Sequence, residues 1–297
     1  MKLKNGDARD EMARWRMVLK VVAVSLGIAS GVLGGRSPAH ADEIIRINGS
    51  GAMLDMMTLH NGAYLKKHPD VRIVMEKPLG SSGAIKALLA GALDLAVSSK
   101  TLTPGEARQG ARSREYGRTP LVIVTEKSVP KTDITTAELE EIYLGKARVW
   151  ANGKKIRIVL RPMADIDTVI LRGLSPGMDR ALNFAHAREG MVTAVTDPEL
   201  IEAVSRMPGT IGASALCSLL VRKPPLKSLS LNGVIPTAKA LAERRYPLAK
   251  SVRFVTTGNP SRAVTEYLGF LYSAQGRAIA ERAGVVTDGI GPAGSAP

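Results

Sequence analysis

The chain repeats one local pattern, in which a short β-rich segment leads into a loop of small residues and then into a helical segment. Residues 44–47 lead into a Gly/Ser-rich loop at 48–51, and a helix is expected at 53–67. Residues 71–75 lead into a second such loop at 80–83, and a helix is expected at 84–90. Strands that alternate with helices build parallel sheets with helices on their faces. The pattern therefore predicts an α/β fold.

The same alternation continues through the rest of the 297 residues, a length sufficient for two lobes with cores of their own. Apolar runs predict further strands at 93–97, 120–125, 154–160, 210–213 and 251–256. Helical periodicity predicts helices at 135–144, 199–207, 263–273 and 277–283. Thr136 is the expected cap of the first of these helices.

Residues 1–41 have the three parts of a secretory signal peptide. A basic start is followed by an apolar run at 21–33 and by an A-x-A site that ends at Ala41. The run is shorter than the ~20 residues that a membrane-spanning helix needs. We expect cleavage after Ala41 and a periplasmic mature chain that begins at Asp42, without insertion into the membrane. An uncleaved anchor is the alternative.

Composition disfavours several classes of function. The formal net charge is +14, but only 4% of residues are aromatic, so platforms for stacking nucleic-acid bases are scarce. The single cysteine, Cys217, lies in an apolar run and is expected to be a buried structural thiol. The few histidines have no metal-ligand spacing, so we expect no metal and no cofactor.

The two Gly/Ser-rich loops have the chemistry of an anion cradle. Helix N-termini expose unpaired N–H groups and the positive end of the helix dipole. Glycine lets a ligand approach the backbone, and serine adds a hydroxyl donor. Two such loops at neighbouring strand ends predict a shared anion site. The alternative for each loop is an ordinary helix cap.

From about residue 44 to residue 284, the chain resembles the substrate-binding proteins of ABC phosphate importers. The resemblance is carried by the loop at 48–52, the loop and helix start at 80–86, and the strand end at 94–99. The segment 139–146, with Trp150, matches a helix and turn of the family's second lobe, and the segments 209–212 and 246–248 match motifs late in the family's sequences. The segment 80–86 is the most specific of these matches.

This resemblance implies a two-lobed periplasmic-binding-protein fold of the second class, with two strands crossing between the lobes. Lobe 1 is expected at 42–121 and 249–290, and lobe 2 at 122–248. The crossing strands are expected at 121–125 and 251–256. Residues 291–297 are expected to form a disordered tail, because they are rich in Gly, Pro and Ser.

The resemblance also implies the ligand-binding residues, with Arg161 as the main cationic contact from lobe 2, facing the loops of lobe 1. The expected set is Ser50, Gly51, Ala52, Met53, Ser81, Ser82, Gly83, Ser99, Arg161, Asp165 and Thr168.

Two departures from the family pattern fall on ligand positions. Ser99 stands where the family has an aspartate that faces the ligand. In the segment that starts at Arg161, Ile166 and Asp167 replace the family's serine and glycine. A buried carboxylate accepts the proton of phosphate and repels sulfate, whereas a serine hydroxyl does not exclude sulfate. Asp165 or Asp167 is therefore a candidate for the missing acceptor. The alternative is that the site has lost its preference for phosphate or serves another anion.

The function expected is capture of phosphate or a similar oxyanion in an interlobe cleft for an ABC importer, without catalysis. The expected partners are the anion and an ABC permease, with no nucleic acid, and the protein is expected to be a monomer. A periplasmic anion sensor or scavenger is one alternative. A phosphate-ester hydrolase is another, but no histidine partners the loop serines within their motifs.

Overall fold

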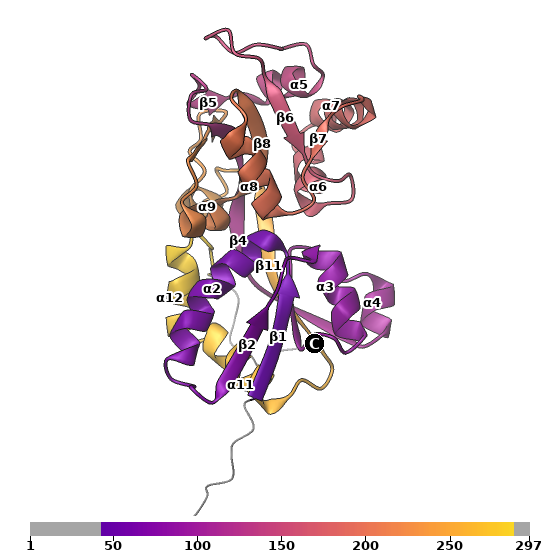
Figure 1. Ribbon diagram of the computed structural model, residues 1–297, viewed down its shortest axis with the longest axis vertical. Helices are drawn as coiled ribbons and strands as arrows, with labels where there is room; N and C mark the ends of the chain where they lie inside the picture. The colour runs from indigo at the N-terminus through magenta and orange to yellow at the C-terminus, as the bar shows by residue number, and fades with distance from the viewer. Residues whose placement is uncertain (1–42, 288–297) are drawn as a thin grey trace, which may run out of the picture. The chain divides into compact units, whose positions relative to one another are not determined.

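The computed structural model describes residues 43–287. Its strands and helices alternate along most of the chain (Figure 1). The strands are β1 (Glu43–Gly49), β2 (Val71–Met75), β3 (Leu95–Ser98), β4 (Ala111–Glu126), β5 (Asp133–Ile134), β6 (Arg157–Leu160), β7 (Val192–Thr193), β8 (Thr210–Ala215), β9 (Leu226–Ser228), β10 (Ser230–Leu231) and β11 (Ala249–Thr257). The helices are α2 (Gly51–Leu65), α3 (Gly80–Leu89), α4 (Pro104–Arg108), α5 (Thr136–Tyr143), α6 (Ile166–Arg172), α7 (Pro176–Ala187), α8 (Asp197–Arg206), α9 (Leu216–Arg222), α10 (Ala238–Ala242), α11 (Arg262–Leu271) and α12 (Ala274–Arg282).

One sheet runs through both halves of the described chain in the order β2-β1-β3-β11-β4-β8-β6-β7, with β9 beside β4. Strands β1, β2 and β3 are parallel, and β11 is antiparallel to both β3 and β4. Strand β4 pairs with β11 along residues 111–120 and with β8 along residues 121–125. It therefore belongs to both halves, and Figure 1 shows it passing from one to the other beside β11. The predicted α/β class is confirmed.

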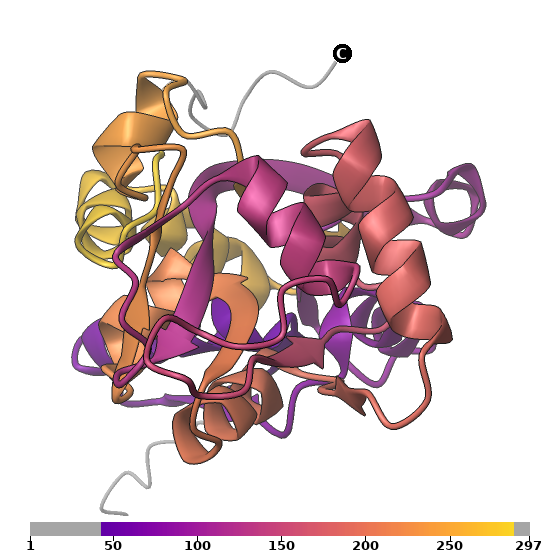
Figure 2. The same cartoon turned by 90° about the horizontal axis from the view of Figure 1, so that it is seen from above.

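The second half of β4 buries both of its faces. Leu121 and Ile123 pack in a cluster with residues of α5 and α7, whereas Val122 and Val124 pack in another cluster with residues of α8. This alternation is the period of two that a strand imposes. Figure 2 shows α5 and α7 on one side of the strands and α8 on another.

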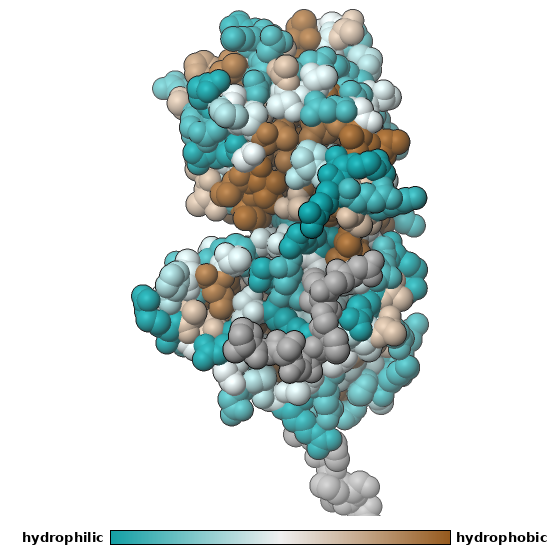
Figure 3. Space-filling view, turned by 180° about the vertical axis from the view of Figure 1, so that it is seen from behind, coloured by the Kyte–Doolittle hydropathy of each residue, from teal (hydrophilic) through white to brown (hydrophobic). Residues whose placement is uncertain are grey.

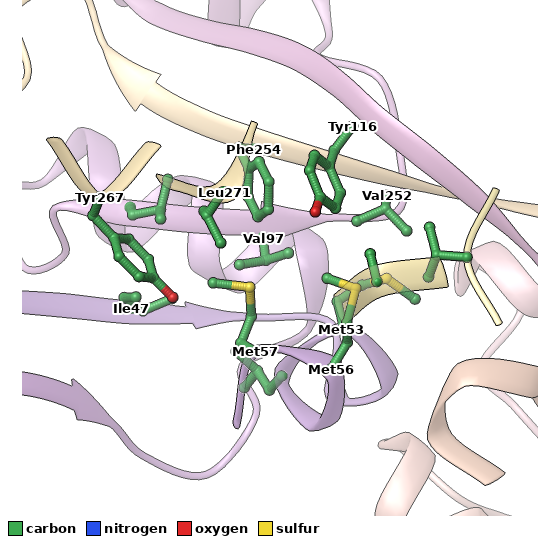
Figure 4. Packing of buried hydrophobic residues seen from close by; sticks show 14 of the residues in the cluster. Ile47, Met53, Met56, Met57, Val97, Tyr116, Val252, Phe254, Tyr267 and Leu271 are labelled. Carbon is green, nitrogen blue, oxygen red and sulfur yellow. The ribbon is translucent and has the colours of Figure 1, made fainter. Parts of the chain in front are cut away.

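The core around β1 and β3 contains three methionines of α2. Met53, Met56 and Met57 are fully buried and pack in one cluster with Val252 and Phe254 of β11, as Figure 4 shows. Methionine is flexible enough to fill an irregular space between a helix and a sheet. The packing fixes the first turn of α2 against the sheet.

Several elements differ from the sequence prediction. The first half of β4 was not predicted, because Gly117 and Pro120 are both typical of strand ends. A Cβ on Gly117 would lie 2.5 Å from the carbonyl oxygen of Val286, so this glycine permits a close backbone approach. The N-cap of α5 is Thr135 rather than Thr136, since the Thr135 side chain accepts the N–H of Glu138. Helices α6 and α7 were also missed.

The signal-peptide and tail predictions concern residues outside 43–287. Within that range, no helix combines the length and hydropathy that crossing a membrane requires. The expected lobe boundaries remain a prediction.

Candidate functional site

A cleft of about 380 Å³ lies between two sets of segments. One set comprises the starts of α2 and α3, and the other comprises α6 with the turn before it and the start of α8. The walls of the cleft are formed by Ser50, Gly51, Pro78, Leu79, Gly80, Ser81, Ser82, Gly83, Lys100, Arg161, Pro162, Ala164, Asp165, Ile166, Val169, Val195, Thr196 and Asp197. Both predicted Gly/Ser-rich loops therefore open onto one space.

The N-terminus of α3 is open toward this cleft. Gly80 begins the helix with a φ of +69°, a conformation that glycine adopts at little cost. The N-cap position, Leu79, has no side-chain oxygen and makes no capping hydrogen bond. The N–H groups of Ser81, Ser82 and Gly83 are among the first four of the helix, which have no partner within the helix. Free donors and the helix dipole make this end of α3 attractive to an anion.

The N-terminus of α2 is already occupied by a carboxylate of the protein itself. Asp197, the first residue of α8, is 2% exposed and faces the backbone N–H of Ala52. A Cβ added to Gly51 would lie 3.3 Å from Oδ2 of Asp197 and 2.8 Å from Cδ of Pro198, so the two helix starts are in close contact. The dipole of α2 therefore stabilises Asp197 in this structure.

Asp197 belongs to a buried cluster of charges. The Nζ of Lys250 lies 2.8 Å from Asp167 Oδ1 and 3.0 Å from Asp197 Oδ1, and all three side chains are at most 2% exposed. Arg161 Nη2 lies 2.8 Å from Asp165 Oδ2 and 3.7 Å from Asp197 Oδ2. Three carboxylates thus face two cations.

The excess of one carboxylate affects protonation. Burial, together with the negative charges of Asp197 and Asp165, raises the pKa of Asp167 to about 7. Lys250 lowers this pKa, but its effect is smaller than that of burial. Burial also opposes ionisation of Asp197, but Lys250 and Arg161 outweigh it and lower its pKa. Burial would lower the pKa of Lys250, yet the two carboxylates beside it raise that pKa. A proton on Asp167 balances the cluster.

This arrangement predicts a specific pH dependence of stability. The pKa of Asp167 is higher in the folded than in the unfolded chain, so the folded state binds more protons between about pH 4 and about pH 7. The contribution of Asp167 to the free energy of unfolding is present below this window and is lost as pH rises through it. Asp167→Asn is expected to remove this loss.

The measurement is chemical denaturation of both proteins from pH 4.5 to pH 8. Burial lowers the pKa of His60, which gives the opposite slope, so the difference between the two proteins isolates Asp167. Asp167→Asn should gain stability relative to the wild type as pH rises. A difference that does not change with pH would show that Asp167 ionises normally.

Arg161 reaches the cleft but is not a free cation. Its side chain is 6% exposed, its Nε and Nη2 donate to Asp165, and its Nη1 donates to the carbonyl oxygen of Ala194. Lys100 also reaches the cleft, and its Nζ pairs with Glu106 at 2.8 Å. Because both cations are already paired with carboxylates, the backbone N–H groups of α3 are the donors more available to an anion.

The structure brings together part of the predicted set. Seven of the predicted residues line the cleft: Ser50, Gly51, Ser81, Ser82, Gly83, Arg161 and Asp165. Four do not: Ala52 and Met53 are fully buried in α2, Thr168 is 2% exposed and donates its hydroxyl to the carbonyl oxygen of Arg161, and Ser99 is 2% exposed behind Ser81.

Ser99 is nevertheless tied to the cleft. Its backbone N–H donates to Ser81 Oγ at 2.9 Å. Its own hydroxyl is buried and has no hydrogen-bond partner among residues 43–287. A buried hydroxyl without a partner is costly. It therefore adds an unsatisfied polar group beside the open start of α3.

Asp197 and Lys250 were not predicted. Lys250 was detectable in part, because Lys250, Val252 and Phe254 follow one another at every second position and so share one face of a strand. Asp197 gave only the signal of a helix start, as it follows the N-cap Thr196 and precedes Pro198. Its contact with α2 depends on the fold.

Two core groups share one sheet through β4 and β11, and a cleft of a size usual for small-molecule sites lies at their junction. A family model described as the PBP superfamily domain matches residues 35–275, and the chain belongs to this periplasmic-binding-protein superfamily.

Two curated relatives share about a quarter of their residues with this chain. The chain is 25% identical over 276 residues to the phosphate-binding protein PstS of Borreliella burgdorferi, covering 89% of this chain and 97% of that protein. It is 24% identical over 275 residues to the PstS of Bacillus subtilis, covering 86% and 87% of the two chains. Both relatives are named as binding proteins.

Solved structures show the same fold. A Clostridium perfringens substrate-binding protein with bound phosphate superposes with a TM-score of 0.68 at 19% identity, covering 82% of this chain and 99% of the other. An ABC-type phosphate transport receptor from Vibrio cholerae gives a TM-score of 0.59 at 21% identity, covering 82% and 99%. These likenesses confirm the predicted periplasmic-binding-protein fold.

Proposed function

We propose that this protein binds phosphate or a similar tetrahedral oxyanion in the cleft and delivers it to an ABC importer from the periplasm. The observation that carries the proposal is the open N-terminus of α3, where Ser81, Ser82 and Gly83 present N–H groups and hydroxyls to the cleft. The names of the two relatives and the bound phosphate of a structural neighbour support the same ligand class.

We also propose that the two core groups are lobes that move relative to each other. The first core group packs around β1, β3 and β11, and nearly all of its buried residues lie before residue 120 or after residue 249. The second core group packs around β6, β8 and the second half of β4, and its buried residues lie between residues 120 and 249. Ala215 and Cys217 are exceptions, because the start of α9 packs against α2 in the first group. Closure of such lobes around an anion would exclude water from its hydrogen bonds.

Binding without catalysis fits the surroundings of the cleft. His60 is fully buried and contacts the carbonyl oxygens of Met56 and Gly276 rather than a cleft serine. Cys217 is also buried, and burial raises the pKa of its thiol to about 12. Neither residue is in a position to activate a nucleophile on a ligand at α3.

Selectivity between phosphate and sulfate depends on an acceptor for the proton of phosphate. Asp167 is fully buried and paired with Lys250, so it does not reach the cleft. Asp165 lines the cleft, its side chain is 20% exposed, and its Oδ2 accepts a hydrogen bond from Arg161 alone among the described residues. A carboxylate oxygen has room for a second hydrogen bond. We therefore assign the acceptor role to Asp165.

The test is calorimetric titration of the mature chain with phosphate and with sulfate. The wild type is expected to bind phosphate with one site and to prefer it over sulfate, and Asp165→Asn should reduce this preference at least tenfold, which is about 1.4 kcal/mol. Asp167→Asn is the matched control and should leave the preference unchanged. Absence of binding to both anions would refute the proposed function, and an unchanged preference in Asp165→Asn would refute the role of Asp165.

A further inference from the structure

The cleft has one site for an anion at a helix N-terminus and does not surround that site with hydrogen-bond donors. Of the helix starts that reach it, α2 is occupied by Asp197 and α6 is capped by its own Asp165, which accepts the N–H of Asp167 at 2.9 Å. The start of α8 also reaches the cleft and is capped by the Thr196 side chain. Within residues 43–287, the start of α3 has neither a side-chain cap nor a contact like that of Asp197 with α2. A small oxyanion removed from water needs donors around all of its oxygens, because each unpaired polar atom is costly. The uncapped backbone donors are those of α3, and the two cations that line the cleft, Lys100 and Arg161, are paired with carboxylates.

Beside the charged side chains of Lys100, Arg161 and Asp165, the cleft is lined by several exposed hydrophobic side chains. Leu79 is 52% exposed at the start of α3, Val169 is 49% exposed on α6, and Val195 is 64% exposed just before α8. Pro78, Pro162, Ala164 and Ile166 continue the same lining. Seen from behind, hydrophobic surface gathers in the half of the molecule that holds β6 and α6, bordering the junction of the two halves (Figure 3). Large apolar side chains exposed together in a hollow are typical of a ligand site.

The size of the cleft agrees with an organic ligand. Its volume of about 380 Å³ lies in the range of roughly 300–1,000 Å³ that is usual for sites of organic small molecules. A phosphoryl group that is bound at α3 would leave much of this space next to Leu79 and Val169. Filling that space with an apolar group removes apolar surface of both partners from water, which favours binding.

We infer that the preferred ligand is an organic oxyanion, with a phosphonate or phosphate-ester head at the N-terminus of α3 and a short apolar substituent against Leu79, Val169 and Val195. This inference rests on the proposed function, because it uses the same anion site. It differs in assigning specificity to the apolar wall as well as to the donors.

The experiment titrates the mature chain with inorganic phosphate, methylphosphonate and n-butylphosphonate in a calorimeter. The affinity should rise along this series, and n-butylphosphonate should bind at least tenfold more tightly than inorganic phosphate. Val169→Ser should reduce the ratio of these two affinities at least threefold. Val149→Ser is the control, because Val149 is 62% exposed and lies outside the cleft, and it should leave the ratio unchanged.

The outcomes separate this inference from the function on which it rests. If inorganic phosphate binds at least as tightly as n-butylphosphonate, and Val169→Ser leaves the ratio unchanged, the inference is wrong and the proposed oxyanion binding stands. If none of the three probes binds, the proposed function fails together with the inference.

Discussion

Replacing Lys250 with methionine is expected to destabilise the protein by about 3–5 kcal/mol, the usual cost of removing one partner from a buried ion pair. Lys250 is fully buried and lies within 3.0 Å of both Asp167 and Asp197. Methionine is similar in length and apolar, so it fills the space without supplying a charge. The two carboxylates would then have only Arg161 as a neutralising partner.

The measurement is urea denaturation at pH 7 of the wild type and of Lys250→Met. Lys239→Met is the matched control, because its side chain is 81% exposed and its nearest carboxylate, on Glu243, is 3.9 Å away. The control should change stability by less than about 0.5 kcal/mol. Adding Asp167→Asn to Lys250→Met should recover part of the loss, since one unpaired carboxylate is removed. If Lys250→Met is as stable as the control, Lys250 does not neutralise the buried carboxylates of Asp167 and Asp197.

Replacing Ser82 with aspartate is expected to weaken phosphate binding more than a hundredfold. Ser82 is exposed at the third position of α3 and lines the cleft. Two like charges about 5 Å apart repel by about 3 kcal/mol at an effective dielectric constant of about 20, and every 1.4 kcal/mol is a factor of about ten in affinity. The carboxylate would also occupy the N–H groups that the anion needs.

The stability of this variant provides an internal check. An acidic residue in the first turn of a helix is favourable, so Ser82→Asp should keep or slightly raise the stability of the fold. Ser82→Asn has nearly the same shape without the charge and should lose less than about tenfold in affinity, the effect of roughly one neutral hydrogen bond. Equal affinities for phosphate in Ser82→Asp and the wild type would place the anion elsewhere.

The sequence was most informative where structure is determined by neighbouring residues. The two Gly/Ser-rich loops lie at helix starts as predicted, because glycine and serine favour these positions through local backbone geometry. Strand 251–256 was predicted within two residues of β11, since its alternation of apolar residues reports the burial of one face.

The sequence was least informative where long-range contacts decide. Both loops look alike as anion cradles, yet α2 is occupied and α3 is open, because the fold brings Asp197 to the N–H of Ala52. Similarly, Arg161 was predicted to be the main cationic contact of the ligand, and the structure adds three carboxylates around it, from the turn before α6, from α6 itself and from α8. Spacing along the chain does not contain that information.

The most direct test of anion binding at α3 is a crystal structure of the mature protein with inorganic phosphate at saturating concentration. The phosphate is expected at the start of α3, within hydrogen-bonding distance of the backbone N–H groups of Ser82 and Gly83, while Asp197 keeps its contacts with Ala52 and Lys250. A phosphate bound to the N–H of Ala52, with Asp197 displaced from α2, would contradict this expectation.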